Sequence, residues 1–111
     1  MSFLPGVDDA AVEQNKVVAY LLNAEHPEGG PKARFFLGHG ARPEAWTVFR
    51  AVLIEHARAN PLANVRTSPY GSLYQIDCFV TLPDGASCCI RTVWEIRIGQ
   101  THPRLVTVHP N

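Results

Sequence analysis

The pattern of hydrophobic and polar positions changes its period along the chain. Between residues 43 and 59, Trp46, Phe49 and Leu53 recur at intervals of three or four residues, which predicts an amphipathic helix. From Leu73 onward apolar and polar residues alternate instead, which predicts strands with one buried face. The chain therefore divides into a helical first part and a β-rich second part.

Three helices are predicted before residue 61. Asn15 can cap the first, Pro31 suits the start of the second, and Asn60-Pro61 ends the third. Residues 1–14 have no clean period and are interpreted as an extended lead-in. The predicted helices cover residues 16–23, 32–39 and 43–59, and residues 60–71 are interpreted as a connector.

Three strands are predicted after the connector, over residues 73–82, 86–98 and 104–109, with turns at Pro83-Asp84-Gly85 and at 99–103. Helices followed by an antiparallel meander indicate a single α+β domain over residues 1–111. We expect about three helices and a sheet of three or four strands, with the lead-in as the candidate fourth strand. Cys78, Cys88, Thr92 and Ile98 fall on the predicted buried face, where Thr92 would be a hydrogen-bonded core hydroxyl.

Composition narrows the class of protein. Ten basic and ten acidic residues give a net charge of zero, which argues against broad electrostatic binding of nucleic acid but allows a local basic patch. No apolar run approaches the roughly 20 residues of a membrane span, and the N-terminus has no signal-peptide pattern. Three cysteines do not form a disulfide framework. We therefore expect a cytoplasmic protein with reduced thiols and no membrane association.

The loop HPEGGPKARFF, residues 26–36, holds the most distinctive chemistry. His26 can act as an acid or base near neutral pH, or can simply bond the backbone of its loop. Lys32 lies in the first turn of a helix, where a cation opposes the helix dipole, which hints at a nearby phosphate or carboxylate unless solvent screens it. The amides of Gly29 and Gly30 can bind an anion, although this signal is far weaker than a P-loop.

The outward face of the predicted sheet is polar. Such a face is commonly just solvated, and becomes a site only where a substrate lies across it. Arg104 suits either an exposed position or a phosphate clamp. The polar residues of this face are Gln75, Asp77, Arg91, Glu95 and Arg97, with Thr107 and His109 as neighbours from the last strand.

Metal-ligand spacings such as CxxC and HExxH are absent from the sequence, so no metal and no cofactor are expected. Cys88 and Cys89 are adjacent and point to opposite faces of their strand. Nothing in the spacing supports a Cys–His nucleophile.

Five segments together resemble an uncharacterised bacterial domain family. They are KVVAYLLNAEHPEGGPKARFFLGHG with Trp46, then SPYGSLYQID, RTVWEI and PRLVTVHP. The family pattern is YLL-x-x-x-HP-x-G-x-x-KA-x-FF, followed by YG-x-x-Y, T-x-W and PR-hydrophobic-VT-x-x-P, and it covers about residues 16–110. Members of that family occur as short free-standing proteins, sometimes beside a small antitoxin-like gene, and as parts of phage head-associated proteins.

The arrangement also resembles, more distantly, the barnase/EndoU/colicin/RelE superfamily of metal-independent ribonucleases, many of them toxins. That resemblance implies cleavage of RNA by its own 2′-hydroxyl, with His26 as acid or base and Lys32 steadying the phosphate. Thr107 would bond a phosphate oxygen or orient a base. His109 stands where EndoU-like toxins commonly carry tyrosine, and would be a second proton-transfer group. Substrate contacts would come from Arg91, Arg104, Gly29, Gly30 and Tyr70.

The leading hypothesis is therefore an endoribonuclease-like domain, plausible as the toxin of a toxin–antitoxin pair, with RNA and a small antitoxin-like protein as partners. One alternative is a non-catalytic module that docks a partner through the sheet face or edge. Another is an anion- or nucleotide-binding domain using Gly29, Gly30 and Lys32. Convergence of His26, Lys32, Thr107 and His109 on one cleft is what the catalytic hypothesis requires.

Overall fold

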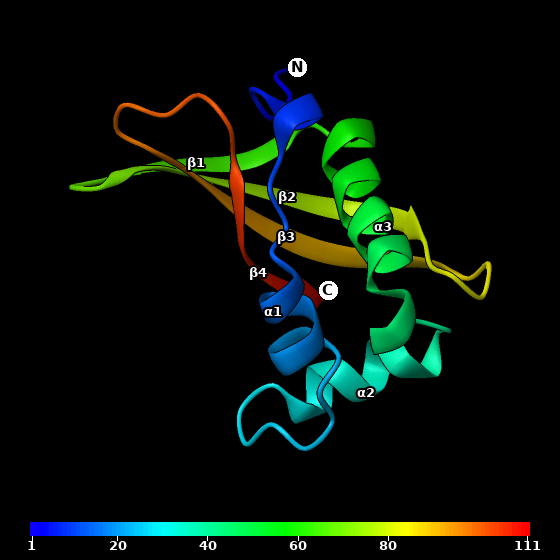
Figure 1. Ribbon diagram of the computed structural model, residues 1–111. Helices are drawn as coiled ribbons and strands as arrows, with labels where there is room; N and C mark the ends of the chain where they lie inside the picture. The colour runs from blue at the N-terminus through cyan, green and yellow to red at the C-terminus, as the bar shows by residue number, and fades with distance from the viewer.

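The computed structural model describes residues 1–111 and shows one four-stranded antiparallel sheet in the order β1-β2-β3-β4. Helix α3 lies across one face of this sheet, and α1 and α2 lie beyond its β4 side (Figure 1). The α+β plan predicted from the sequence is confirmed. The strands are β1 Leu62–Ser68, β2 Gly71–Thr81, β3 Ser87–Arg97 and β4 Arg104–Pro110.

The predicted helices are confirmed with shifted ends. The first begins at Gln14 as α1, Gln14–Lys16, and continues as the π-helical η2, Val17–Leu21. The second is α2, Gly30–Gly38, with Pro31 in its first turn. The third opens as a 3₁₀ turn, η3 Pro43–Ala45, and becomes α3, Trp46–Ala59. A further 3₁₀ turn, η1, covers Val7–Asp9 in the lead-in.

The fourth strand is not where the sequence placed it. The predicted connector over residues 60–71 contains β1, whereas the lead-in makes only a single parallel bridge, between Ala11 and Arg104. Strand β1 is an edge strand, and its residues 63–67 are all exposed. Because neither of its faces is buried, it has no alternation of apolar and polar residues to reveal it.

The core lies between α3 and the sheet. Phe49, Leu53 and Ala57 of α3 are fully buried, as the helical periodicity predicted. Phe36 of α2 joins them, with its ring centroid 5.0 Å from that of Phe49. Trp94 of β3 is also fully buried. Aromatic pairs at this spacing stabilise a core beyond the area they bury, so α2 is anchored to α3.

A buried hydrogen-bond chain crosses the interface between α3 and β3. Thr92 and His56 are both inaccessible to solvent. Nε1 of Trp94 donates to Oγ1 of Thr92 over 2.9 Å, and that hydroxyl lies 3.0 Å from Nδ1 of His56. Nε2 of His56 lies 3.1 Å from the carbonyl oxygen of Cys78 and therefore carries the proton, which leaves Nδ1 to accept from Thr92. The prediction of a hydrogen-bonded core hydroxyl at Thr92 is confirmed.

Two residues predicted to be buried are exposed. Cys78 has a φ of 109°, which breaks the alternation of β2 and turns its side chain to solvent. Ile98 lies just past the end of β3, beside the β1–β2 turn, and is 76% exposed. Cys88, by contrast, packs against the core as predicted.

The protein should lose stability as the pH falls below about 6.5, the ordinary pKa of histidine. Burial lowers the pKa of His56, with a smaller opposing contribution from the Cys78 carbonyl. The unfolded chain therefore binds a proton before the folded chain does. The contribution of His56 to the free energy of unfolding is fully present above about pH 6.5. Below that pH, each histidine with a lowered pKa reduces the free energy of unfolding by up to about 1.4 kcal/mol per pH unit. Urea unfolding at several pH values measures this slope.

The matched control compares His56→Gln with His102→Gln, a partly exposed histidine of the β3–β4 connection. His56→Gln should make the free energy of unfolding less dependent on pH, and His102→Gln should leave that dependence as it is in the wild type. An unchanged slope in His56→Gln would show that another group controls the transition. Burial also lowers the pKa of His109, so some dependence should persist in either variant.

Candidate functional site

The loop before α2 holds His26 in one orientation. Nδ1 of its ring accepts the backbone N–H groups of Glu28 at 3.1 Å and Gly29 at 3.0 Å. The proton of the neutral ring therefore lies on Nε2, at the opposite edge. The N–H of Gly30 donates to the His26 carbonyl at 3.0 Å, and a Cβ at Gly30 would lie 2.7 Å from the carbonyl oxygen of Ala24. The glycines thus allow the tight turn that fixes His26.

Three side chains around His26 link the loop to β4. The ring of Tyr20 packs edge-on against the His26 ring, with centroids 4.5 Å apart. The Nζ atom of Lys32 lies 5.2 Å from the centroid of the Tyr20 ring, a cation–π distance. The same Nζ donates to Oγ1 of Thr107 at 3.5 Å. Lys32, at the start of α2, therefore connects the His26 loop with the last strand.

A β-bulge in β4 orients the strand's half of the site. Its register against β3 shifts between Leu105 and Thr107, and Val106 has no partner there. Leu105 and Val108 are both buried although they are three residues apart. The extra residue permits this, because it breaks simple alternation. Thr107 and His109 consequently lie on the partly exposed, outward side.

His109 lies in a positive environment. Burial lowers the pKa of its imidazole, and the charges of Lys32 and Arg91 lower it further. Arg91 is the residue opposite His109 in the β3–β4 register, and Nε of its guanidinium bonds the carboxylate of Asp77 at 2.8 Å. This pairing raises the pKa of Arg91 and fixes the guanidinium in place. His109 is therefore held in its neutral form near pH 7, ready to accept a proton.

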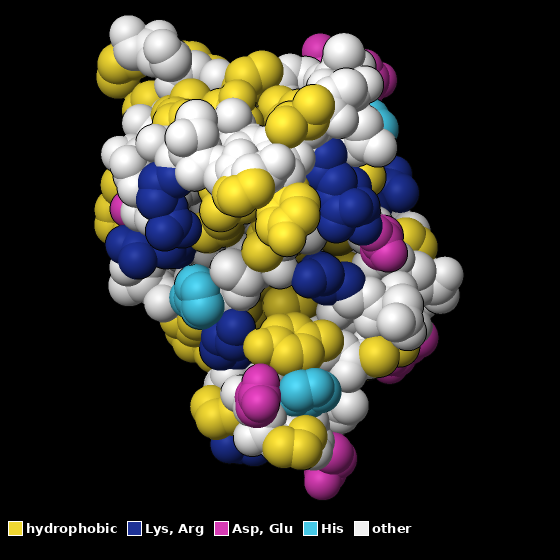
Figure 2. All heavy atoms as spheres, turned by 90° about the vertical axis from the view of Figure 1, so that its left-hand side faces the viewer, with side chains coloured by type: hydrophobic (Ala, Val, Ile, Leu, Met, Phe, Trp, Pro, Cys, Tyr) yellow, Lys and Arg dark blue, Asp and Glu magenta, His cyan; other side chains and the backbone are white.

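Two lysines without a carboxylate partner lie at this place. Lys16 bonds the carbonyl of Val106 at 2.8 Å and Lys32 bonds Thr107, and neither forms an ion pair. The arginines nearby are neutralised in the pairs Arg91–Asp77, Arg97–Glu95 and Arg104–Glu13. Figure 2 shows this side of the molecule, with Lys and Arg side chains flanking a hydrophobic strip and His side chains among them.

Lys16 borders a cavity of about 450 Å³ between the helical segment and β4, and Lys32 adjoins it through its bond to Thr107. Its lining combines one imidazole, one hydroxyl, one phenol and one ammonium group with a few apolar atoms. The lining residues are Asn15, Lys16, Ala19, Tyr20, His26, Val106 and Thr107. A cavity with these groups suits a ligand that has both an anionic part and a flat ring.

Of the residues singled out from the sequence, His26 and Thr107 line this cavity and Lys32 adjoins it through Thr107, whereas His109, near Lys32, and Arg91, opposite His109, do not line it. Tyr70 is not among them: it lies in the β1–β2 turn, away from α2 in Figure 1, and is 74% exposed.

The remaining candidates have other contacts. Arg104 bonds Glu13 at 2.7 Å and lines a neighbouring groove with Lys16. The N–H groups of Gly29 and Gly30 are both bonded to atoms of His26, so they hold that residue.

Tyr20 and Lys16 are site residues that sequence reasoning missed. Tyr20 was interpreted only as an apolar residue of the first helix, although it also packs on His26. Lys16 gave no signal, since its contact with Val106 spans 90 positions in the chain. Only the closure of the β4 edge by the N-terminal segment brings these residues to the cavity.

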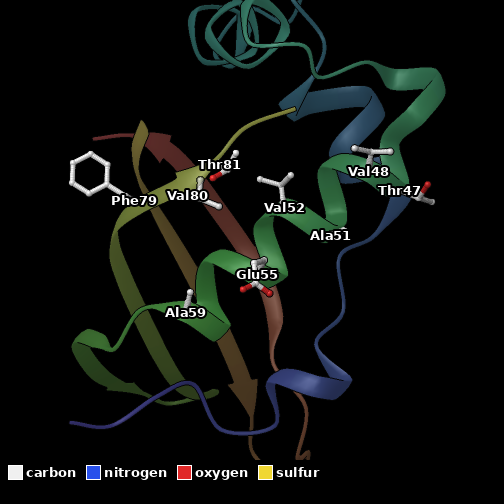
Figure 3. Close-up of a pocket in the computed structure, with 9 residues that line it drawn as sticks. All are labelled: Thr47, Val48, Ala51, Val52, Glu55, Ala59, Phe79, Val80 and Thr81. Carbon is white, nitrogen blue, oxygen red and sulfur yellow. The ribbon is translucent and has the colours of Figure 1, made fainter. Parts of the chain in front are cut away.

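A second cavity, of about 650 Å³, lies between α3 and β2 (Figure 3). Its lining is mostly apolar and includes the exposed side chains of Phe79 and Val48. Glu55 is its single ionisable lining residue, and it forms an ion pair with Arg58. This groove offers an apolar contact surface rather than groups for proton transfer. Its lining residues are Thr47, Val48, Ala51, Val52, Glu55, Ala59, Phe79, Val80 and Thr81.

Comparison with known proteins gives a family and a fold. A family model described as "Domain of unknown function (DUF6883)" matches residues 3–111. A comparison with curated protein sequences found no significant match. Among solved structures, one chain of a "Contact-dependent growth inhibition toxin - immunity protein complex from Klebsiella pneumoniae 342" is similar, with a TM-score of 0.69 and 18% identity. The similarity covers 90% of this chain and 98% of that chain, and at this identity it is a likeness of fold.

These findings confirm the resemblance to an uncharacterised family and relate the fold to one found in a toxin–immunity complex. No helix of the structure has both the length and the apolar character that crossing a bilayer requires.

Replacing Lys32 by methionine should raise the pKa of His109, because the substitution removes a nearby positive charge and keeps the length of the side chain. An NMR titration of the imidazole resonances measures the change. Lys16→Met is the matched control, since Lys16 is not among the charges that lower the pKa of His109. Equal shifts in the two variants would contradict the proposed proximity of Lys32 and His109.

Proposed function

The chain belongs to the family described as a domain of unknown function, DUF6883, and we propose that it is a metal-independent endoribonuclease that uses the 2′-hydroxyl of RNA as nucleophile. One observation carries the proposal: His26 and Thr107, from two distant segments of the chain, line one cavity, Lys32 bonds Thr107 beside it, and Lys32 and Arg91 lie near enough to His109 to lower its pKa. Two imidazoles, a cation and a hydroxyl are the groups that this chemistry needs.

His109 serves as the general base. Its lowered pKa keeps it neutral near pH 7, so it can take the proton from a 2′-hydroxyl. The freed oxygen then attacks the adjacent phosphorus. Lys32 and Arg91, which lower the pKa of His109, also lie where negative charge would develop on the phosphate.

His26 serves as a hydrogen-bond donor to the leaving group. Its Nδ1 accepts two backbone N–H groups, so Nε2–H is the edge available to a substrate. It would donate a hydrogen bond to the departing 5′-oxygen, which takes its proton from solvent, and the products would be a 2′,3′-cyclic phosphate and a 5′-hydroxyl. Thr107, bonded to Lys32, would contact a non-bridging phosphate oxygen. Tyr20, packed against His26, offers a face on which a base can stack.

A toxin role with a small neutralising protein partner is part of this proposal. The fold is shared with a chain of a toxin–immunity complex, which supports a partner protein that covers the site. The net charge of zero is compatible with this proposal, because Lys16 and Lys32 have no carboxylate partner at the site.

The alternative function, docking of a partner through the sheet edge, is favoured by β1. Its residues 63–67 are exposed, including Val65, and it has no neighbouring strand on its outer side. An open edge of this kind can pair with a strand of another chain.

Single substitutions at the site should abolish cleavage of RNA without unfolding the protein. We expect His109→Gln, His26→Gln and Lys32→Met each to lower the cleavage rate by about 100-fold or more, because each removes a proton-transfer or charge-stabilising group. Gel analysis of a labelled RNA, in the presence of EDTA, measures the rate and identifies the cyclic phosphate product. Growth arrest on expression should disappear in the same variants.

His102→Gln and Arg50→Met are the matched controls, since they alter one histidine and one exposed cation of α3 that do not line the cavity. They should keep the rate within about twofold. If the wild-type protein neither cleaves RNA nor arrests growth, the nuclease proposal fails. Edge docking would be supported instead by a partner protein that copurifies with the wild type but not with Val65→Lys. Activity that requires added metal would contradict the mechanism.

A further inference from the structure

A second cluster of reactive groups lies at the opposite end of α2 from the His26 loop. Nε2 of His39, just past the helix, is 4.0 Å from Sγ of Cys88 on β3. Nδ1 of the same ring lies 2.9 Å from Oδ2 of Asp84, in the β2–β3 turn. Cysteine, histidine and aspartate thus stand in the order of a nucleophile, a base and a group that orients the base. The residues of the pair His39–Cys88 are 49 positions apart, so their spacing in the sequence did not reveal it.

The hydrogen bonds select the tautomer that a base needs. The carboxylate of Asp84 can only accept, so Nδ1 of His39 carries the proton and Nε2 has a free lone pair toward the thiol. The backbone N–H of Ala86 lowers the pKa of Asp84, and the bond to His39 lowers it further. Asp84 is therefore ionised at neutral pH and stabilises the imidazolium that forms when His39 takes a proton.

The cluster is held by backbone as well as by side chains. The N–H of Asp84 donates to the carbonyl of His39 at 2.9 Å, and its Oδ1 accepts the N–H of Ala86 at 2.9 Å. The ring of Phe35 lies 4.8 Å from that of His39 and covers it on one side. Both His39 and Asp84 keep part of their side chains exposed, at 29% and 38%. Cys88 is itself partly exposed, so a small solute can reach the thiol.

We propose that Cys88 is a reactive thiol that exchanges with small disulfides, with His39 as its base and Asp84 as the residue that positions that base. The Cys88 thiol gives its proton to Nε2 of His39, and the thiolate attacks one sulfur of the disulfide. A bond forms between Cys88 and that sulfur while the original S–S bond breaks. The leaving thiolate takes the proton back from His39, so the thiol and the disulfide become a mixed disulfide and a new thiol.

The other two cysteines supply internal controls. Cys78 is the exposed one, and its side chain has no hydrogen bond to an acid or base. Cys89 points away from Cys88, and its sulfur accepts only the side-chain amide of Asn111 at 3.7 Å. If exposure alone decided reactivity, Cys78 would react first. If the His39 base decides it, Cys88 reacts first although it is less exposed.

The test uses chains with one remaining thiol and cystamine as the disulfide. The double variant C78S/C89S keeps only Cys88, and C88S/C89S keeps only Cys78. Intact-mass spectrometry follows the gain of one cysteamine group at pH 7. Each rate is divided by the rate of the same chain unfolded in urea, which removes differences due to the reagent. We expect the Cys88-only chain to react about tenfold faster than the Cys78-only chain.

Adding His39→Gln to the Cys88-only chain should lower its normalised rate about tenfold, to the level of Cys78. Asp84→Asn, which keeps an acceptor for the Ala86 N–H, should lower it severalfold. A slower Cys88 than Cys78, or a rate that His39→Gln leaves unchanged, overturns the proposal. Circular dichroism must show that each variant is folded, because an unfolded chain has a normalised rate of one and would imitate the loss of the His39 base. The result does not depend on RNA cleavage, because none of these residues lines the His26 cavity.

Discussion

The hydrogen-bond chain from Trp94 through Thr92 to His56 is the constraint on which the packing of this domain depends. Each of its polar groups is buried, and leaving one unpaired would cost about 1–3 kcal/mol. Apolar side chains could slide past one another at small cost, but this chain is satisfied in one alignment of α3 on β3 only. Helix α3 in turn carries Phe49, on which Phe36 of α2 packs. The position of α2, and of Lys32 at its start, follows from that alignment.

The bulge in β4 allows one strand to contribute side chains both to the core and to the accessible side of the sheet. Leu105 and Val108 fill the core, while Thr107 and His109 stay accessible beside the helical segment. An unbroken strand would have placed Leu105, Thr107 and His109 on one face, so that burying the leucine would also have buried the histidine. The irregularity also leaves the Val106 carbonyl free of β3, and Lys16 bonds it. Packing and chemistry are thus separated within one short strand.

Much of the fold was predictable because burial leaves a period in the sequence. The spacing of Phe49 and Leu53 revealed α3, and the alternation around Ile90 and Trp94 revealed β3. Strand β1 was not predicted, because an exposed edge strand imposes no period of apolar residues on the sequence. Half of the site was visible, since His26 and Lys32 stand out in a loop of glycine and proline. The rest was not, because Tyr20 near His26 and Lys16 near Val106 are contacts of tertiary structure that local patterns do not encode.

The bond between Lys32 and Thr107 joins residues 75 positions apart, on elements made early and late in synthesis. Strand β4 must be in place before the cavity has a second wall, and the lead-in contacts that strand through Ala11 and Arg104. A partly synthesised chain can form the His26 loop and α2 without possessing the site. If the proposed activity is correct, the ribosome making this protein is exposed to it only after β4 has folded onto β3. The order of the elements would then delay that activity until β4 has been synthesised.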